Sequence, residues 1–436
     1  MNVSPVVGKA LEPVYVVDGT RTPFLKALGR PNSMSAADLA VAAGRHLLLR
    51  QPFEPQSIDE VILGCVLPAP DEANIARVVS LRLGCGHETP AWTVQRNCAS
   101  GMQAIDTAIR NIQNGSSRMV LAGGVEAMSR APLQWRPELV SWFANWRKAR
   151  GVPAKMKLLG ALSLKQLRPV VALLKGLTDP VVGLSMGQTG EILAHRFGIT
   201  REEMDAFALE SHQRLNQAQE EGLFKKEVTP LFEVGGGIEG ADQGLRKDST
   251  LEALGRLKPV FDRHHGQLTA GNSAQVSDGA ALLLLADEQS VMKHNLRVLG
   301  RVTPAAWAGL DPAQMGLGPV HAIAQLLKRE KQSMSGIDYW EINEAFAAQV
   351  LACDRAARDA DYGRKALGLD GALGGFPRER LNVDGGAISI GHPVGASGAR
   401  IVLHLLNLLQ SKNARRGIAA LCIGGGQGGA MLAEAV

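Results

Sequence analysis

Strands and helices alternate through most of this 436-residue chain, and that order limits what it can fold into. Short apolar runs predict strands, and apolar residues spaced three and four apart predict helices. In the first half, the predicted strands are residues 14–17, 59–64 and 118–124, with a polar loop at 19–23 and a helix at 36–49. This alternation indicates a layered α/β architecture, in which helices cover a largely buried sheet.

The second half of the chain repeats this order of elements. The predicted strands are residues 298–302, 340–342 and 418–423, and the predicted helices are residues 321–328 and 397–409. In each half one apolar strand ends in glycines, at Gly123 and Gly124 in the first and after Ile423 in the second. We therefore expect two similar folding units.

Residues 131–259 interrupt the alternation, and we interpret them as an inserted subdomain. Two helices are predicted within them, at 186–196 and 201–221. The second begins with Thr200 as N-cap and Glu203 three residues later, which is the pattern of a capping box. The predicted domains are a first half of residues 1–130 and 260–297, the insertion of residues 131–259, and a second half of residues 298–436.

The net charge of +5 is concentrated in one part of the insertion. Residues 131–178 hold nine lysines and arginines and a single acidic residue, Glu138, and so carry +8. The remainder of the chain carries −3, the difference between +5 and +8. The basicity therefore belongs to the insertion and not to the protein as a whole, so we expect no nucleic-acid partner.

Cysteine content and the chain terminus predict a cytoplasmic protein. The five cysteines are odd in number and include no Cys-x-x-Cys pair, which favours a reducing compartment over a disulfide framework. Residues 1–9 lack the apolar run of a signal peptide and the arginine-rich pattern of a transit peptide. No segment reaches the roughly 18 consecutive apolar residues of a membrane-spanning helix.

Cys98 is a candidate nucleophile because it lies where a predicted strand gives way to a predicted helix. Apolar residues of that helix share one face, at Met102, Ile105, Ile109 and Ile112. The positive end of a helix dipole lowers the pKa of a nearby thiol and so favours the reactive thiolate. A cysteine considered alone is more often a small buried apolar residue, so the interpretation depends on the other reactive groups.

Three such groups lie among small residues in the second half. His392 is in a Gly-His-Pro turn before a predicted helix, Cys422 ends a strand before a glycine run, and Asn343 ends another strand. The glycines after Cys422 also fit the G-x-G-x-x-G pattern of dinucleotide-binding sites. Only seven residues follow Gly429, which leaves no room for the helix and second strand of such a site.

Five motifs in this order make the chain resemble the thiolase family. They are Asn-Cys-Ala-Ser-Gly-Met at 97–102, Gly-Asn-Ser at 271–273 with Ser-Asp-Gly-Ala at 277–280, Asn-Glu-Ala-Phe at 343–346, Gly-His-Pro at 391–393, and Cys-Ile-Gly-Gly-Gly at 422–426. Related ketoacyl synthases share the fold but have a Cys-His-His pattern, whereas the pattern here is Cys98, His392 and Cys422. The resemblance implies an α/β fold with five layers, α-β-α-β-α, built from two similar halves with an inserted loop subdomain.

The resemblance also implies the chemistry, which is CoA-dependent cleavage of the C2–C3 bond of a 3-ketoacyl-CoA. Cys98 is expected to attack the keto carbon and become acylated, with His392 accepting its proton. Cys422 is expected to protonate the departing acetyl-CoA enolate and then to deprotonate the second CoA. One oxyanion site is expected from His392 and a water held by Asn343, and another from the backbone N–H groups of Cys98 and Gly424.

Three residues are expected to contact the substrate. Met186 resembles the methionine that lines the pantetheine channel in the family, and ordinary core packing is an equally good explanation of it. Many thiolases place a pantetheine-contacting serine at the position of Ala274, where this chain has its hydroxyl one residue earlier, at Ser273. Phe346 ends the Asn-Glu-Ala-Phe motif. CoA and acyl-CoA are expected as substrates, with no metal and no other cofactor.

The basic segment of residues 131–178 also holds Trp135, Trp142 and Trp146, three of the six tryptophans. Basic side chains interleaved with aromatic and leucine side chains fit a surface element that meets an anionic membrane or a partner subunit. A solvated insertion whose charges help to bind the CoA phosphates fits equally well.

This insertion is similar to the long insertions of thiolase subunits in fatty-acid β-oxidation complexes, which pair with a hydratase/dehydrogenase subunit. We therefore expect a 3-ketoacyl-CoA thiolase of β-oxidation, as a homodimer or dimer of dimers. An acetoacetyl-CoA thiolase working in the condensation direction is the alternative enzyme. A non-catalytic subunit for assembly or membrane docking is the alternative of another class. It is expected to lack one of the reactive groups, and all of them are present in this chain.

Overall fold

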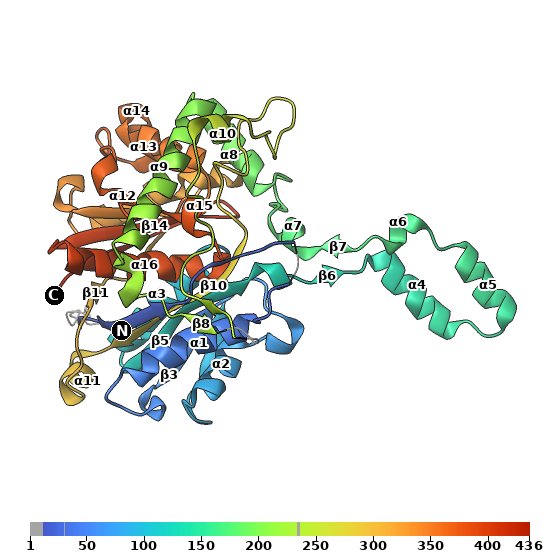
Figure 1. Cartoon of the computed structure of the whole chain (residues 1–436), viewed down its shortest axis with the longest axis horizontal. Coiled ribbons are helices and arrows are strands. Elements are labelled where there is room, and N and C mark those ends of the chain that lie inside the picture. Colours follow the sequence, from blue (N-terminus) through green and yellow to red (C-terminus); the bar gives the residue numbers. More distant parts are fainter. Residues whose placement is uncertain (1–11, 30, 233–235) are drawn as a thin grey trace, which may run out of the picture.

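The computed structural model describes residues 12–29, 31–232 and 236–436, which form a layered α/β body with one projecting arm (Figure 1). Residues 1–9, for which the sequence predicts no targeting segment, lie outside the described residues. Among the helices that the structure describes, none combines the length and apolarity needed to cross a bilayer.

The first half of the chain forms a largely buried sheet, whose main path has five strands among the described residues. Its strands, in spatial order, are β1 (Tyr15–Arg21), β10 (Ser277–Ala286), β5 (Met119–Ala127), β3 (Glu60–Gly64) and β4 (Ala91–Val94). Every residue of β3, β5 and β10 is buried, which explains their unbroken apolar runs. β10 pairs antiparallel with β1 and β5, whereas β3 pairs parallel with β5 and β4.

The second half forms a sheet that is continuous with the first. Its strands are β11 (Gly300–Val302), β12 (Ala306–Gly309), β13 (Tyr339–Ile342), β14 (Arg416–Ile423) and β15 (Gln427–Glu434). β14 lies between β13, with which it is parallel, and β15, with which it is antiparallel. β11 joins the two halves, because it pairs with β1 on one side and with β15 on the other.

Helices cover the outer face of each half of this continuous sheet and fill the space between the halves, so the five-layered α-β-α-β-α fold is confirmed. The outer layer on the first sheet is α1 (Ala36–Leu49) with α2 (Ile75–Leu83), and that on the second sheet is α12 (Gly318–Arg329) with α13 (Ala347–Arg358). The central layer is α3 (Ser100–Gln113) and α16 (Val394–Ser411), which fill one apolar core between the sheets. α16 contacts β5 and β10 on one side and β14 on the other.

The polar loop predicted at residues 19–23 is partly wrong, because β1 continues through Arg21. Thr20 and Arg21 pair with β10 and are fully buried. The Arg21 guanidinium is held by the carboxylates of Glu227 at 2.8 Å and Asp242 at 2.7 Å. The buried end of β1 is stable because the charge of Arg21 is compensated by these two carboxylates, which come about 200 positions later in the chain.

Residues 131–259 contain two structurally different parts. The first is the arm, in which the paired strands β6 (Leu133–Gln134) and β7 (Val170–Val171) form the base. The helices of the arm are α4 (Pro137–Lys148), α5 (Val152–Gly160) and α6 (Leu164–Leu167), and α7 (Ala172–Gly176) follows β7. The arm extends away from the body (Figure 1) and its helices contact mainly one another.

The second part packs on the body. α8 (Met186–Arg196) and α9 (Arg201–Glu220) both contact α13, so they cover the outer layer of the second half. The capping box at the start of α9 is confirmed: the Glu203 N–H donates to Thr200 Oγ1 at 3.2 Å, and the Thr200 N–H donates to Glu203 at 2.8 Å.

Candidate active site

The two central helices bring the Cys98 and His392 loops together. Cys98 precedes α3 and His392 precedes α16, and the first turns of these helices are in contact through glycines. A Cβ at Gly101 would lie 2.8 Å from the Gly395 carbonyl, and one at Gly398 would lie 2.7 Å from the Met102 nitrogen. Larger residues would separate the helices, so the small residues after Cys98 serve packing as well as access.

The pKa of the Cys98 thiol is not lowered as the helix-dipole argument predicts. Burial raises this pKa to about 11, and the backbone N–H groups of Gly424 and of Cys98 itself, which donate toward the sulfur, offset only part of that effect. The prediction was wrong because desolvation disfavours the thiolate more strongly than the helix terminus favours it. A base is therefore needed to generate the nucleophile.

His392 has the properties of that base. Its imidazole is buried, and burial together with the charge of Arg400 lowers its pKa to about 4, so the ring is neutral near pH 7. Its Nδ1 lies 2.7 Å from Ser397 Oγ, and that hydroxyl donates to the Pro393 carbonyl at 2.9 Å. A serine hydroxyl has a single proton, so it accepts from Nδ1–H. Nε2 is then the basic nitrogen.

We expect the Ser397→Ala substitution to lower kcat about 10- to 100-fold, because the Nδ1–H tautomer loses its acceptor. The KM for CoA should change little. Ser397→Thr is the matched control, since a helical threonine keeps a hydroxyl that bonds to the carbonyl four residues back. Steady-state kinetics between pH 6 and 9 check this, and equal kcat in the alanine and threonine variants would contradict the assigned tautomer.

Cys422 and Asn343 lie side by side at the carboxyl ends of two parallel strands. Cys422 is in β14 and Asn343 directly follows β13, with the Asn343 N–H bonded to the Ala420 carbonyl at 2.9 Å. Burial raises the pKa of the Cys422 thiol well above its ordinary value, and the nearby Cys98 raises it further. A protonated thiol beside Cys98 can act as a general acid.

The residues expected to contact substrate lie around the same loops. Met186, at the start of α8, lies beside Gly424, where a Cβ would be 3.1 Å from its sulfur. Ser273 and Phe346 face each other in an isolated β-bridge, and the Phe346 ring packs edge-on against Phe261. Both Ser273 and Phe346 are buried. The structure thus places a thioether, a hydroxyl and an aromatic ring near the candidate catalytic groups.

Several buried polar atoms of these residues find no hydrogen-bond partner among the described residues. They are His392 Nε2, both amide atoms of Asn343, and Ser273 Oγ. An unpartnered buried polar group is costly, and such groups are retained where a ligand or reactant bonds to them. Three residues chosen from sequence motifs therefore present free polar atoms in one part of the interior.

Two buried glutamates that support the site were given no role from the sequence. Glu126 accepts from the N–H groups of Val66 at 2.9 Å and Gly395 at 3.0 Å, and burial raises its pKa to about 7. It thereby ties the start of α16 to β5. Its signal in the sequence is a charged residue within an otherwise apolar strand, which implies a buried partner.

Glu344 supports the Asn343 loop in a similar way. Its carboxylate accepts from Ser211 Oγ at 2.7 Å and from the Asn382 amide at 2.9 Å. Burial raises its pKa. The Asn-Glu pair marks this position in the sequence, but the sequence does not say which of the two residues faces the site.

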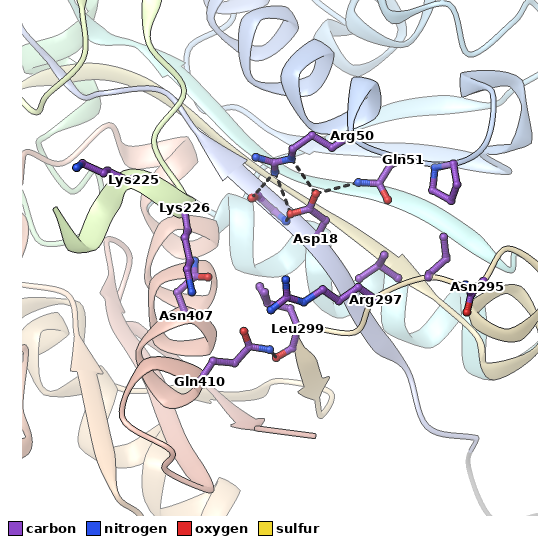
Figure 2. A pocket seen from close by; sticks show the side chains of 14 residues that line it. Asp18, Arg50, Gln51, Lys225, Lys226, Asn295, Arg297, Leu299, Asn407 and Gln410 are labelled. Carbon is purple, nitrogen blue, oxygen red and sulfur yellow. Dashed lines mark hydrogen bonds and ion pairs between the residues drawn. The ribbon is translucent and has the colours of Figure 1, made fainter.

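A separate cavity of about 520 Å³ lies beside the C-terminal end of α16, at the opposite end from His392 (Figure 2). Figure 2 shows Arg50 bonded to Asp18, with Lys225, Lys226 and Arg297 around them. These basic side chains are exposed at the surface. None of the candidate site residues lines this cavity.

Within the described parts of the chain, no three histidine, cysteine, aspartate or glutamate side chains are grouped as in a metal site. The groups that lie together are two thiols, an imidazole, an amide and backbone N–H groups. These groups are suited to thioester and enolate chemistry.

Comparison with known proteins identifies the family. Residues 14–289 match the thiolase N-terminal domain and residues 296–435 match the thiolase C-terminal domain. The chain is 40% identical over 428 residues to a β-ketoadipyl-CoA thiolase from Pseudomonas aeruginosa, which covers 97% of this chain and 99% of that relative.

Two solved structures show the same fold along nearly the whole chain. One is human mitochondrial 3-ketoacyl-CoA thiolase in complex with CoA, with 37% identity, a TM-score of 0.83 and coverage of 98% of both chains. The other is the Bacillus anthracis acetyl-CoA acetyltransferase, with 35% identity, a TM-score of 0.84 and coverage of 98% of this chain and 100% of that one. The chain belongs to the thiolase family of acyltransferases, which use CoA as a substrate.

Proposed function

We propose that this thiolase is a 3-ketoacyl-CoA thiolase of fatty-acid β-oxidation, which cleaves its substrate to acetyl-CoA and a shortened acyl-CoA. The observation that supports the reaction is that the Cys98 and Cys422 thiols lie near each other, while His392 Nε2 and the Asn343 amide are buried without hydrogen-bond partners among the described residues. The likeness to a human 3-ketoacyl-CoA thiolase along 98% of the chain supports the choice of substrate.

In the first half-reaction, His392 Nε2 takes the proton of Cys98, and the thiolate attacks the keto carbon. The C2–C3 bond then breaks, the acyl group stays on Cys98, and Cys422 gives its proton to the acetyl-CoA enolate. His392 and a water on Asn343 stabilise the enolate oxygen. The Cys98 and Gly424 N–H groups stabilise the oxygen on the attacked carbon.

In the second half-reaction, the Cys422 thiolate takes the proton of an incoming CoA. The CoA thiolate attacks the acyl group on Cys98, and the shortened acyl-CoA leaves as the Cys98 thiolate is expelled. The protonated His392 returns its proton to Cys98. Both thiols and the imidazole are then in their starting protonation states, so the cycle balances without a further reactant.

Thiolysis rates across a series of 3-ketoacyl-CoA substrates test the proposed substrate. Higher kcat/KM for medium and long chains than for acetoacetyl-CoA would support it, and activity confined to acetoacetyl-CoA would select the acetoacetyl-CoA thiolase. A third candidate is 3-ketoadipyl-CoA, because a β-ketoadipyl-CoA thiolase is 40% identical to this chain. Preference for that dicarboxylic substrate would overturn the β-oxidation assignment.

We propose further that the arm contacts an anionic membrane surface. Its basic segment carries +8 on a chain whose remainder carries −3. Large apolar side chains are exposed along the arm, among them Leu133, Trp135, Val140, Phe143, Val152, Met156, Leu159, Leu164 and Leu167. In α4 only Leu139 is buried. Exposed apolar groups beside many cations suit the interface of an anionic bilayer.

Removing the arm should abolish membrane binding and leave thiolysis intact. Since Gln134 pairs with Val170, residues 135–169 can be replaced by Asn-Gly, a two-residue turn for a β-hairpin. We expect the intact protein to sediment with phosphatidylserine-containing vesicles at low salt and the shortened one to remain in solution. kcat should stay within about twofold, because the arm contacts mainly itself.

The variant without residues 135–169 also distinguishes membrane binding from the other possible roles of the arm. Phosphatidylcholine vesicles serve as the neutral control, and binding to them alone would argue against a charge-based contact. A raised KM for CoA, with vesicle binding unchanged, would instead indicate that the arm binds the CoA phosphates. Loss of pairing with a hydratase/dehydrogenase subunit, again with vesicle binding unchanged, would assign the arm to that subunit.

We also propose a homodimer or dimer of dimers, located in the cytoplasm. β4 ends the sheet with no further strand among the described residues, close in sequence to the Cys98 loop, and Trp92 on it is 38% exposed. Such an edge strand is suited to a second copy of the chain. The five free cysteines are compatible with a reducing compartment. Light scattering after gel filtration tests the oligomer.

A further inference from the structure

Asn97, which precedes the candidate nucleophile, adopts an unusual backbone conformation. Its φ is +44°, in the left-handed region where asparagine is one of the better tolerated residues. The turn is held from within, because the Asn97 carbonyl accepts from Ser100 Oγ at 2.7 Å and from the Ser100 N–H at 3.0 Å. The Asn97 side chain takes no part in those bonds.

That side chain instead reaches the second half of the chain. Its Nδ2 donates to the Gly424 carbonyl at 2.8 Å, and its Oδ1 accepts from the Gln95 amide at 3.2 Å. Only the nitrogen of an amide side chain can donate to a carbonyl, so these two contacts assign its orientation. The Asn97–Gly424 bond joins residues 327 positions apart.

The neighbouring residue makes a second link between the same two loops. Arg96 donates to the Gln427 side chain at 3.1 Å, and its guanidinium lies 4.3 Å from the centre of the Trp307 ring. Two consecutive residues of the nucleophile loop thus bind the segment 424–427. The loop before Cys98 and the glycine loop after Cys422 therefore form one assembly.

Gly424 begins the turn between β14 and β15, which the pairing of Ile423 with Gln427 closes. It has no side chain to pack, and Gly425 and Gly426 after it have positive φ values of +90° and +74°. At the far end of this turn the Gly426 carbonyl accepts from the Leu310 N–H at 2.8 Å. At the near end, the Gly424 N–H donates toward the Cys98 sulfur and its carbonyl is held by Asn97.

We propose that Asn97 is a positioning residue, which holds the Gly424 carbonyl and thereby aims the Gly424 N–H at the Cys98 sulfur and at the oxygen of the acyl group. This proposal rests on the proposed role of Cys98 as the nucleophile. Without this contact the ends of the turn stay held by the strand pairing and by Leu310, but the Gly424 peptide is free to tilt. The N–H that stabilises the thiolate and the developing oxyanion is then displaced.

Two substitutions of Asn97 distinguish the effect of its side chain from the effect of its backbone conformation. Asn97→Gly keeps access to positive φ and removes the amide, and Asn97→Asp keeps the size but places a carboxylate oxygen against the Gly424 carbonyl. Cys98 is the one half-buried cysteine, the other four being buried, so iodoacetamide should label it selectively. We expect the alkylation rate at pH 8 to fall about tenfold in both variants, as one unit of thiol pKa would produce.

The kinetic expectation is a lower kcat with little change in KM. The loss should be about 10- to 100-fold, below that for complete removal of an oxyanion donor. Asn295→Gly is the matched control, because Asn295 is exposed, has a φ of +50° and lies in none of these loops. It should keep the wild-type alkylation rate and kcat.

The proposal is overturned by wild-type alkylation and kcat in both Asn97 variants, or by a lower melting temperature with unchanged alkylation. Gln95→Ala removes the side chain that donates to Asn97 Oδ1 and so orients the Asn97 amide. Gln95 is exposed, so this substitution tests the Asn97–Gly424 contact without a risk to folding. It should slow alkylation about threefold, since one neutral hydrogen bond is lost, and an unchanged rate counts against the proposal. Loss of labelling in Cys98→Ala shows that the label is on Cys98, and thiolysis by the same variant tests its role as nucleophile separately.

Discussion

Replacing Cys98 with alanine should lower thiolysis at least ten-thousandfold, the effect expected when a covalent nucleophile is removed. No acyl group can be carried without its sulfur, and the oxyanion groups that remain have no intermediate to stabilise. The acyl-enzyme should be visible as an added mass in the wild-type protein after exposure to 3-ketoacyl-CoA without free CoA. It should be absent from the variant.

Cys85→Ala is the matched control for the loss of a thiol. Cys85 is 1% exposed and packs with the outer helices of the first half, remote from the second-half residues of the site. That substitution should cost about 1 kcal/mol or more in stability and leave kcat near the wild-type value. Substantial thiolysis by the Cys98→Ala protein would refute the mechanism.

Replacing Cys422 with alanine should lower thiolysis about a thousandfold, within the range for general acid–base groups. The enolate then lacks its proton donor, and the incoming CoA lacks its base. Acylation of Cys98 by 4-nitrophenyl acetate should persist, because nitrophenolate leaves without needing a proton. A burst of one nitrophenolate per site, retained in Cys422→Ala and absent in Cys98→Ala, distinguishes the roles of the two thiols.

Cys353→Ala provides the control for a buried thiol near Cys422. Cys353 is fully buried in α13 and bonds to the Gly316 carbonyl at 3.1 Å, and burial raises its pKa to about 12. This variant should retain both the burst and thiolysis. Cys422→Ala protein with thiolysis within about threefold of wild type would remove Cys422 from the proton transfers, since such groups typically contribute a hundredfold or more.

The elements that the sequence predicted best have a local physical cause. The helix predicted at residues 36–49 coincides with α1, and the strand predicted at 418–423 lies within β14. Both follow from apolar periodicity, which neighbouring residues establish together. The end of β1 was mispredicted because a charged residue such as Arg21 is typical of a loop. Only the folded structure shows that Glu227 and Asp242 pair with it.

The reactivity of the candidate nucleophile shows the same limit. A local argument, the start of a helix, predicts a lower pKa for Cys98. The structure shows that burial raises this pKa to about 11, because protein from both halves removes water from the thiol. Desolvation depends on everything that surrounds a group and so cannot be read from the residues adjacent to it.

The sequence by itself determined the family and the kinds of reactive group, which short motifs encode, and the alternation of strands and helices, which periodicity encodes. The order of the layers followed from the family resemblance. Only the tertiary structure decided how those groups are held. Ser397 sets the tautomer of His392, and the Asn97 side chain donates to the carbonyl of Gly424, 327 positions away. These contacts join groups that are far apart in the sequence and meet only when the chain folds. A hydrogen bond also requires its two atoms to be placed to within tenths of an ångström, and neighbouring residues in the sequence do not determine such positions.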